Sequence, residues 1–184
     1  PFDAGTADDF VLPASPLCRW TVTGVQWAGK YWVNATPGDI NGFRIVFWED
    51  DGGTPRGGGA SSPNLAVAIA SYDISGSASE TSLGADAYSY EATLPEGVEL
   101  LPDVRYWIQI QALAEYPPQW GLHITHTRQG TGPVQYFDLL GLPAWTPVPD
   151  DGDIAFRLLG SPQDLLCDDG NACTADTCAN GQCA

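Results

Sequence analysis

Clusters of acidic side chains are the clearest candidates for a binding site in the sequence. Asp8 and Asp9 stand near the start of the chain, and Asp150, Asp151 and Asp153 stand near its end. Crowded carboxylates repel one another until a hard, oxygen-preferring cation sits between them, and calcium is the first to consider. The clusters flank the first and last expected strands, which often lie near each other in sandwich folds. This pattern predicts a stabilising calcium site, and the alternative is a pair of solvated loops with turn-forming Asp-Gly.

A second candidate lies at the C-terminus, where four of the five cysteines fall close together. They are Cys167, Cys173, Cys178 and Cys183. Their spacing lacks the paired C-x2-C knuckles of structural zinc sites and favours two disulfides, for which three pairings stay open. Cys18 is left over, and it is buried and inert, paired with a tail cysteine, or cross-linked to another molecule.

Short polar side chains stand between the tail cysteines. They are Asp168, Asp169, Asn171 and Asp176. With the intervening glycine they resemble a cation-binding loop, which makes them further calcium candidates. The alternative is that they form turns and Asx caps.

The residue patterns needed for hydrolysis are not found. His123 and His126 are the only histidines, and residues three apart on a strand point to opposite faces, so this pair cannot chelate a metal together. No motif pairs Ser or Cys with either histidine. A carboxylate pair for glycoside hydrolysis stays open among 23 acidic residues, although loop carboxylates are usually solvated. The sequence predicts that the protein is not an enzyme.

Aromatic side chains are the remaining candidates for binding. Seven Trp and seven Tyr exceed what a core of this size requires. Exposed flat rings stack on sugar faces or bury a large area in a protein contact, whereas other rings pack a second face of a sheet. The rings opposite the apolar strand faces, or in loops beside Pro and Gly, form a candidate platform: Trp32, Trp48, Trp107, Tyr116, Trp120 and Trp145.

Strands must position these side chains. Apolar and polar residues alternate over residues 20–27, 43–48 and 104–112, with the period of two that is typical of strands. Further expected strands are 65–72, 87–94, 120–126, 134–140 and 154–159, and the Gly-rich segment 49–64 is expected to be a flexible surface loop. No helical period is sustained. The sequence therefore predicts an all-β fold, a jelly-roll-like antiparallel β-sandwich followed by a small disulfide-stapled C-terminal segment.

Composition divides the chain and narrows its partners. The 184 residues, 43% of them hydrophobic, predict a sandwich domain at 1–162 with an N-terminal arm at 1–9, and a tail at 163–184 that needs covalent closure. A net charge of −16 excludes nucleic acid and anionic lipid as partners. No segment approaches the ~20 apolar residues of a membrane span. The cysteine-dense tail and a processed start at Pro1 predict a secreted, extracellular or cell-surface protein.

Two resemblances support this division. The stretches ADDFVLP, WTVTGVQW, FRIVFWEDDGG, YWIQI and DGDIAFRLLG, within residues 7–160, resemble a β-sandwich module of many secreted bacterial proteins. This resemblance implies a fold and no enzymatic activity. The tail motif CDDGNACTADTC, within residues 167–183, resembles the cysteine repeat of slime-mould extracellular-matrix proteins, which implies a disulfide-stapled knob or spacer.

These features predict a non-enzymatic extracellular structural or adhesive module. Its expected partners are other copies of itself or other surface proteins, as in a self-assembling filament or matrix subunit, with calcium as a structural ion. The alternative is a carbohydrate-binding module of a larger secreted enzyme, with the aromatic rings as its platform and a glycan as its ligand.

Overall fold

The computed structural model describes most of the sandwich and two short pieces of the tail. The described residues are 4–14, 19–32, 40–59, 62–115, 119–138, 142–149, 152–163, 178–179 and 182–183. They are almost entirely β-structure, which confirms the predicted all-β class. Within these ranges no helix has the length and apolar character needed to cross a membrane.

The chain forms thirteen strands within the described ranges. They are β1 (Ala4–Val11), β2 (Arg19–Trp32), β3 (Gly42–Glu49), β4 (Ala70–Ser75), β5 (Thr81–Gly84), β6 (Ala87–Leu100), β7 (Arg105–Leu113), β8 (Gln119–Leu122), β9 (Val134–Phe137), β10 (Leu142–Pro147), β11 (Phe156–Gln163), β12 (Cys178–Ala179) and β13 (Gln182–Cys183). A single 3-10 turn, η1 (Leu65–Val67), precedes β4.

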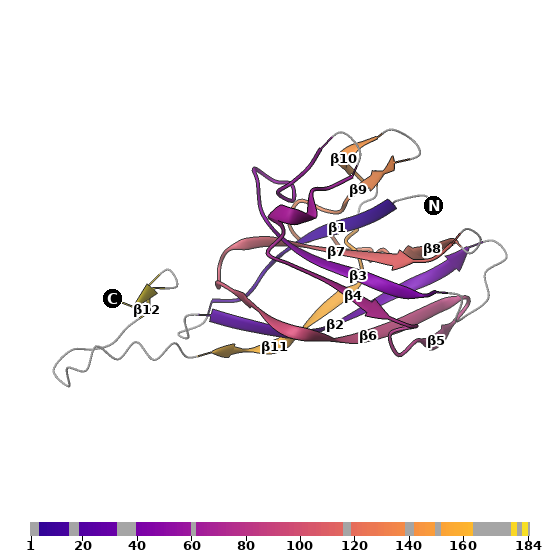
Figure 1. Ribbon diagram of the computed structural model, residues 1–184, viewed down its shortest axis with the longest axis horizontal. Helices are drawn as coiled ribbons and strands as arrows, with labels where there is room; N and C mark the ends of the chain where they lie inside the picture. The colour runs from indigo at the N-terminus through magenta and orange to yellow at the C-terminus, as the bar shows by residue number, and fades with distance from the viewer. Residues whose placement is uncertain are drawn as a thin grey trace.

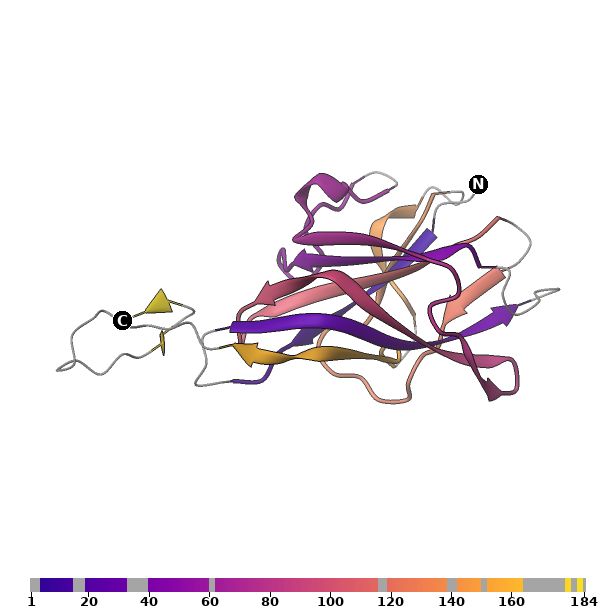
Figure 2. The same ribbon diagram turned by 60° about the horizontal axis from the view of Figure 1, so that its bottom comes forward.

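The strands form two antiparallel sheets that pack face to face as a sandwich (Figures 1 and 2). Sheet A has six strands in the order β10-β9-β1-β7-β3-β4. Sheet B has the order β11-β2-β6-β5, and β8 pairs with the end of β2 beyond β11. A separate pair, β12–β13, lies in the tail.

The first described residues are part of sheet A. Thr6 and Ala7 pair with β7 on one side of β1 and with β9 on the other. Ala4–Asp9, the described part of the expected N-terminal arm, therefore lies inside a sheet of the same chain, while residues 1–3 lie outside the described ranges.

The main core lies between the two sheets. Phe43, Ile45 and Phe47 of β3 point into it with no exposed surface, as their alternation predicts. Trp27 of β2 stacks on Tyr90 of β6 with ring centroids 5.6 Å apart. Aromatic rings thus fill the space where the sheets meet, and each contributes a large buried area.

A second core covers the outer face of sheet A. Its members come from strands and loops far apart in sequence: Ala7, Val46, Trp48, Trp107, Val134, Tyr136 and Trp145. Figure 1 shows η1, β9 and β10 along this side of the sheet, opposite β2, β6 and β11. Because β3 and β7 are buried on both faces, both sets of their alternating side chains are core residues.

Three members of the predicted aromatic platform are therefore unavailable for binding. Trp48 and Trp107 are 0% exposed and Trp145 is 5% exposed. Trp48 and Trp145 pack edge to face with centroids 5.8 Å apart. The prediction failed for these rings because a second layer covers the strand face that lies opposite the main core.

The Gly-rich segment after β3 is anchored to this second core. Trp107 donates an indole hydrogen bond of 2.8 Å to Asp50 Oδ1, and Asp50 forms a bridge with Pro55. The N–H of Ala144 donates to the carbonyl of Gly59 at 3.0 Å. The described part of the segment therefore contacts the outer core through these bonds while lying mostly on the surface, as the sequence predicted, and its flexibility stays a prediction.

Burial predicts that two tryptophan substitutions lower the free energy of unfolding by different amounts. Trp48→Ala should lower the free energy of unfolding by about 3 to 5 kcal/mol, because it empties a sealed site. Trp32→Ala, at a ring 55% exposed, should cost less than about 1 kcal/mol. Urea unfolding of both variants measures the difference, and equal costs would contradict the assignment of Trp48 to a second core.

Candidate functional site

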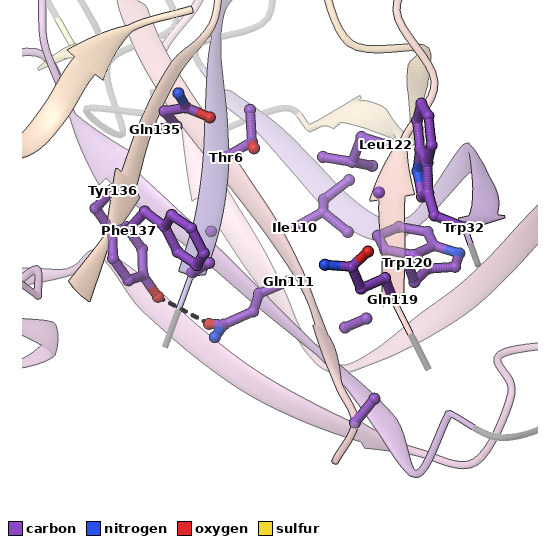
Figure 3. Close-up of a pocket in the computed structure, with 15 residues that line it drawn as sticks. Thr6, Trp32, Ile110, Gln111, Gln119, Trp120, Leu122, Gln135, Tyr136 and Phe137 are labelled. Atoms are coloured by element: carbon purple, nitrogen blue, oxygen red, sulfur yellow. Dashed lines mark hydrogen bonds between the residues drawn. The ribbon is translucent and has the colours of Figure 1, made fainter. Parts of the chain in front are cut away.

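A cleft opens where sheet A extends beyond sheet B. One wall comes from β8 and the end of β2, and the other from β1, β7 and β9 (Figure 3). Its volume is about 430 Å³, which lies in the usual range for ligand sites. β8 is a short strand at the end of β2, and the cleft lies between it and the β1, β7 and β9 strands of sheet A.

Two tryptophans of the β2–β8 pair line the cleft and project from opposite faces of that pair, since Trp120 lies over Gly29 and Trp32 over Gly121. Trp32 at the end of β2 is 55% exposed, and the Lys30 ammonium lies 5.9 Å from its ring centroid. Trp120 of β8 is partly buried, and its indole N–H donates to the Tyr90 hydroxyl at 2.9 Å. The two rings combine an exposed aromatic surface with one anchored in the core.

Glycines opposite the rings let them lie flat across the strands. A Cβ at Gly29 would stand 2.0 Å from Cζ2 of Trp120, and one at Gly121 would stand 3.2 Å from Nε1 of Trp32. Each ring lies diagonally across the partner strand, the arrangement expected for cross-strand neighbours. Substitution of Gly29 would displace Trp120 and reshape the wall.

Amides and hydroxyls line the cleft with the rings. The Tyr136 hydroxyl donates to Gln111 Oε1 at 3.0 Å, and Figure 3 draws this pair with Phe137 on one side and Gln119 with Trp120 on the other. Thr6 and Gln135 add further uncharged polar groups. None of the described lining residues is charged. Such a surface suits a neutral ligand with many hydroxyl groups, because amides and hydroxyls both donate and accept hydrogen bonds.

Of the predicted platform, the structure brings only Trp32 and Trp120 together at this cleft. Tyr116 lies outside the described residues. The sequence analysis did not identify the amides of Gln111, Gln119 and Gln135 as site residues. Their signal was weak, because Gln on a strand usually marks only a solvated face.

The two predicted acidic clusters meet in the fold. Asp8 is fully buried, and its Oδ2 accepts a 2.7 Å hydrogen bond from the N–H of Ile154, next to Asp153. Its Oδ1 accepts from the N–H of Asp9 at 2.9 Å. Burial, together with the nearby Asp153 and Asp9 charges, raises the pKa of Asp8 to about 7, and these two hydrogen bonds act in the opposite direction.

Asp9 anchors the loop that precedes β9. Its Oδ1 accepts from the N–H groups of Thr131 at 2.8 Å and Gly132 at 3.2 Å. Arg105 Nε lies 3.4 Å from the other oxygen. Asp8 and Asp9 thus bind backbone of two loops, and their carboxylate oxygens are already occupied by donors.

The described carboxylates do not assemble a metal site. No group of three or more His, Cys, Asp or Glu side chains suited to a metal occurs within the described ranges. Asp153 accepts from the N–H of Gln129 through Oδ2, while its Oδ1 is buried with no hydrogen-bond partner. Asp150 and Asp151 lie outside those ranges, and calcium at this end of the sandwich stays a prediction.

The tail candidates also fall mostly outside the described residues. This holds for Cys18, Cys167, Cys173, Asp168, Asp169, Asn171 and Asp176. The backbone positions of Cys178 and Cys183 are paired in the β12–β13 ladder. The disulfides and the second calcium site stay predictions.

Comparison with known proteins finds no matching family model, no matching curated protein and no matching solved structure. The two resemblances drawn from the sequence therefore stay predictions, and the functional argument depends on the site itself.

The buried Asp8 carboxyl predicts a loss of stability as pH rises. Its pKa is about 7 in the folded protein against an ordinary value of 3.8, so between these values the folded state holds a proton that the unfolded chain has released. The free energy of unfolding should therefore fall across this window, by up to about 4 kcal/mol. Asp8→Asn cannot ionise and should lack this part of the slope.

Urea unfolding between about pH 5 and pH 8 measures the effect. Asp8→Asn also costs stability at every pH, because its amide N–H₂ must face a backbone donor, so the slope is the readout. Asp73→Asn is the control, since Arg44 lowers the pKa of Asp73 and its titration lies below the window. Identical slopes for wild type and Asp8→Asn would contradict the assignment.

Proposed function

We propose that the chain is a non-enzymatic extracellular adhesive module that binds a neutral carbohydrate in the cleft between β8 and sheet A. One observation carries the proposal: the described lining combines an exposed indole with several amides and has no charged group, in a chain of net charge −16. The proposal assigns the sugar-binding alternative raised by the sequence to this cleft.

The cleft lining offers groups that suit both the apolar face and the hydroxyl groups of a sugar. The apolar face of a pyranose ring packs on a flat indole such as Trp32, and its equatorial hydroxyls meet side chains that donate and accept. Gln119 and Gln135 each offer both kinds of group at the cleft. An aromatic floor with a few polar groups is the usual composition of a ligand pocket.

The charge distribution favours neutral glycans over acidic ones. Asp and Glu outnumber Lys and Arg 23 to 7, so a polyanionic chain approaching the protein is repelled. A neutral glycan carries no charge to be repelled, and the described lining of the cleft is itself uncharged. Binding should therefore depend little on salt, because no ion pair forms with the ligand.

Trp32→Ala should weaken glycan binding about tenfold or more, because it removes the exposed stacking surface. Isothermal titration with neutral glucans, mannans, xylans and galactans, and with polygalacturonate as the acidic comparison, measures the affinity. Leu83→Ala is the control, since Leu83 is 61% exposed but does not line the cleft. A lack of binding to every neutral glycan would reject the proposed function.

A second candidate function is the self-assembling subunit of a surface filament or matrix, and the edge of sheet B favours it. β11 is an eight-residue edge strand paired only with β2 among the described strands. Its free side is a template for a strand from another copy. β1 is already paired within the chain, with β9 through Ala4–Ala7 and with β7 through Thr6–Val11, so β11 is a better assembly edge than the N-terminal strand.

Ser161→Glu should dissociate oligomers that form through β11, because it adds a negative charge to an edge that meets another copy of the same chain, whose net charge is already −16. Light scattering compares the molar mass of this variant with the 19.6 kDa chain mass. Leu83→Glu in β5, at the opposite edge of sheet B, is the control. A wild-type monomer, or oligomers that persist in Ser161→Glu, would exclude assembly through this edge.

We also infer finer features from the sequence, namely a jelly-roll-like topology, secretion, a tail closed by disulfides among Cys167, Cys173, Cys178 and Cys183, and a structural calcium ion. The same sample tests the last two. A chelator should lower the melting temperature if calcium holds the acidic loops, and a reductant should change tail mobility alone if the disulfides are confined to it.

A further inference from the structure

We propose that Glu80 is a positioning residue for the cleft, which acts through Tyr90 to fix the ring of Trp120. The inference rests on the proposed function of the cleft, because Trp120 is one of its walls. Glu80 itself does not line the cleft. Its effect on a ligand is therefore indirect.

A directional chain of hydrogen bonds joins these residues. The Trp120 indole N–H donates to the Tyr90 hydroxyl oxygen at 2.9 Å, and the Tyr90 hydroxyl donates to Glu80 Oε2 at 2.9 Å. An indole nitrogen is only a donor, so the Tyr90 oxygen must accept and its proton must point elsewhere. Glu80 supplies the acceptor for that proton and so sets the direction of the whole chain.

Glu80 also accepts a hydrogen bond from a second tyrosine. The Tyr31 hydroxyl donates to the same Oε2 at 2.6 Å. Tyr31 lies opposite Trp120 in the β2–β8 ladder and packs edge to face on Tyr88, with centroids 5.3 Å apart. The carboxylate thus has one tyrosine partner whose hydroxyl also accepts the Trp120 indole N–H, and a second tyrosine partner whose hydroxyl provides a matched comparison.

Tyr90 is held rigidly enough to transmit the constraint. It is 1% exposed, stacks on Trp27 at 5.6 Å, and packs against Phe43 at 5.0 Å. Trp120 meets Tyr90 and Phe43 edge to face at 5.6 and 5.2 Å. The rings fix where Trp120 lies, and the hydrogen bond selects the direction in which its N–H points.

A strained turn delivers Glu80 to this position. Ala78 and Ser79, directly before it, have φ values of 45° and 53°. Residues other than glycine seldom adopt this backbone region. The N–H of Glu91 donates to the carbonyl of Ala78 at 2.9 Å and holds the turn against β6. Backbone strain of this kind persists only where the surroundings impose it, and it clusters near functional positions.

Fixing the Trp120 ring in advance increases the affinity for the ligand without adding a contact to it. If Trp120 is fixed before the sugar arrives, its rotamer freedom is not lost on binding. Supporting hydrogen bonds around a site serve this purpose in designed and natural binders. Glu80 and Tyr90 are such a supporting layer for the β8 wall.

The test compares Tyr90→Phe with Tyr31→Phe by NMR, without ligand. Tyr90→Phe keeps the ring packing but removes the acceptor, so the Trp120 indole N–H should exchange with solvent about tenfold faster or more. Tyr31→Phe, which removes the other donor to Glu80, should leave that exchange within about twofold. Trp120→Phe assigns the signal, and the six other indoles among seven Trp are internal references.

Two Glu80 variants and a binding measurement complete the test. Glu80→Gln keeps an acceptor oxygen and should retain the wild-type Trp120 signal, whereas Glu80→Ala should shift it. Tyr90→Phe and Glu80→Ala should each weaken neutral-glycan binding about fivefold, the loss expected for one net hydrogen bond.

Unchanged Trp120 exchange in Tyr90→Phe, or an equal change in Tyr31→Phe, would overturn the positioning role. If no glycan binds the wild type, the proposed function fails, and the indole exchange still decides whether Glu80 and Tyr90 position Trp120.

Discussion

The two-sided burial of sheet A is the constraint on which the rest of the structure depends. β3 and β7 present large apolar or aromatic side chains on both faces, so each face must be covered. Sheet B covers one face, and a segment after β3 joins β9 and β10 to cover the other. The cleft lies between the short strand β8 and the β1, β7 and β9 strands of sheet A.

The same constraint gives the acidic residues of β1 their role. A buried carboxylate needs hydrogen-bond donors. Asp8 accepts from the backbone N–H of Ile154, just before β11, and Asp9 accepts from the backbone of the loop before β9. The cost of burying Asp8 appears in its raised pKa. The chain thus uses charged side chains to tie distant loops to its first strand, and uncharged polar side chains to line the cleft.

The tryptophans occupy different structural positions. Trp48, Trp107 and Trp145 seal the outer core, Trp27 lies in the main core, and Trp32 and Trp120 line the cleft. Trp120 also belongs to the main core, because its ring packs on Phe43 there and its N–H joins the hydrogen-bond chain through Tyr90 to Glu80. A wall that shares the rigidity of the core suits a ligand held by stacking, since little order is lost on binding.

Local pattern by itself determined the strands with clear alternation, the two faces of β3 and β7, and the pairing of an early and a late acidic cluster. It missed β1, because buried carboxylates resemble solvated ones until the loops that donate to them are known. It placed a strand at 65–72, where Asn64 caps η1 and β4 begins only at Ala70. Period two tells which side of a strand a residue faces, but contacts between distant segments decide what covers that side. Only the tertiary structure therefore separated buried from exposed tryptophans and brought Gln111, Gln119 and Gln135 to one cleft.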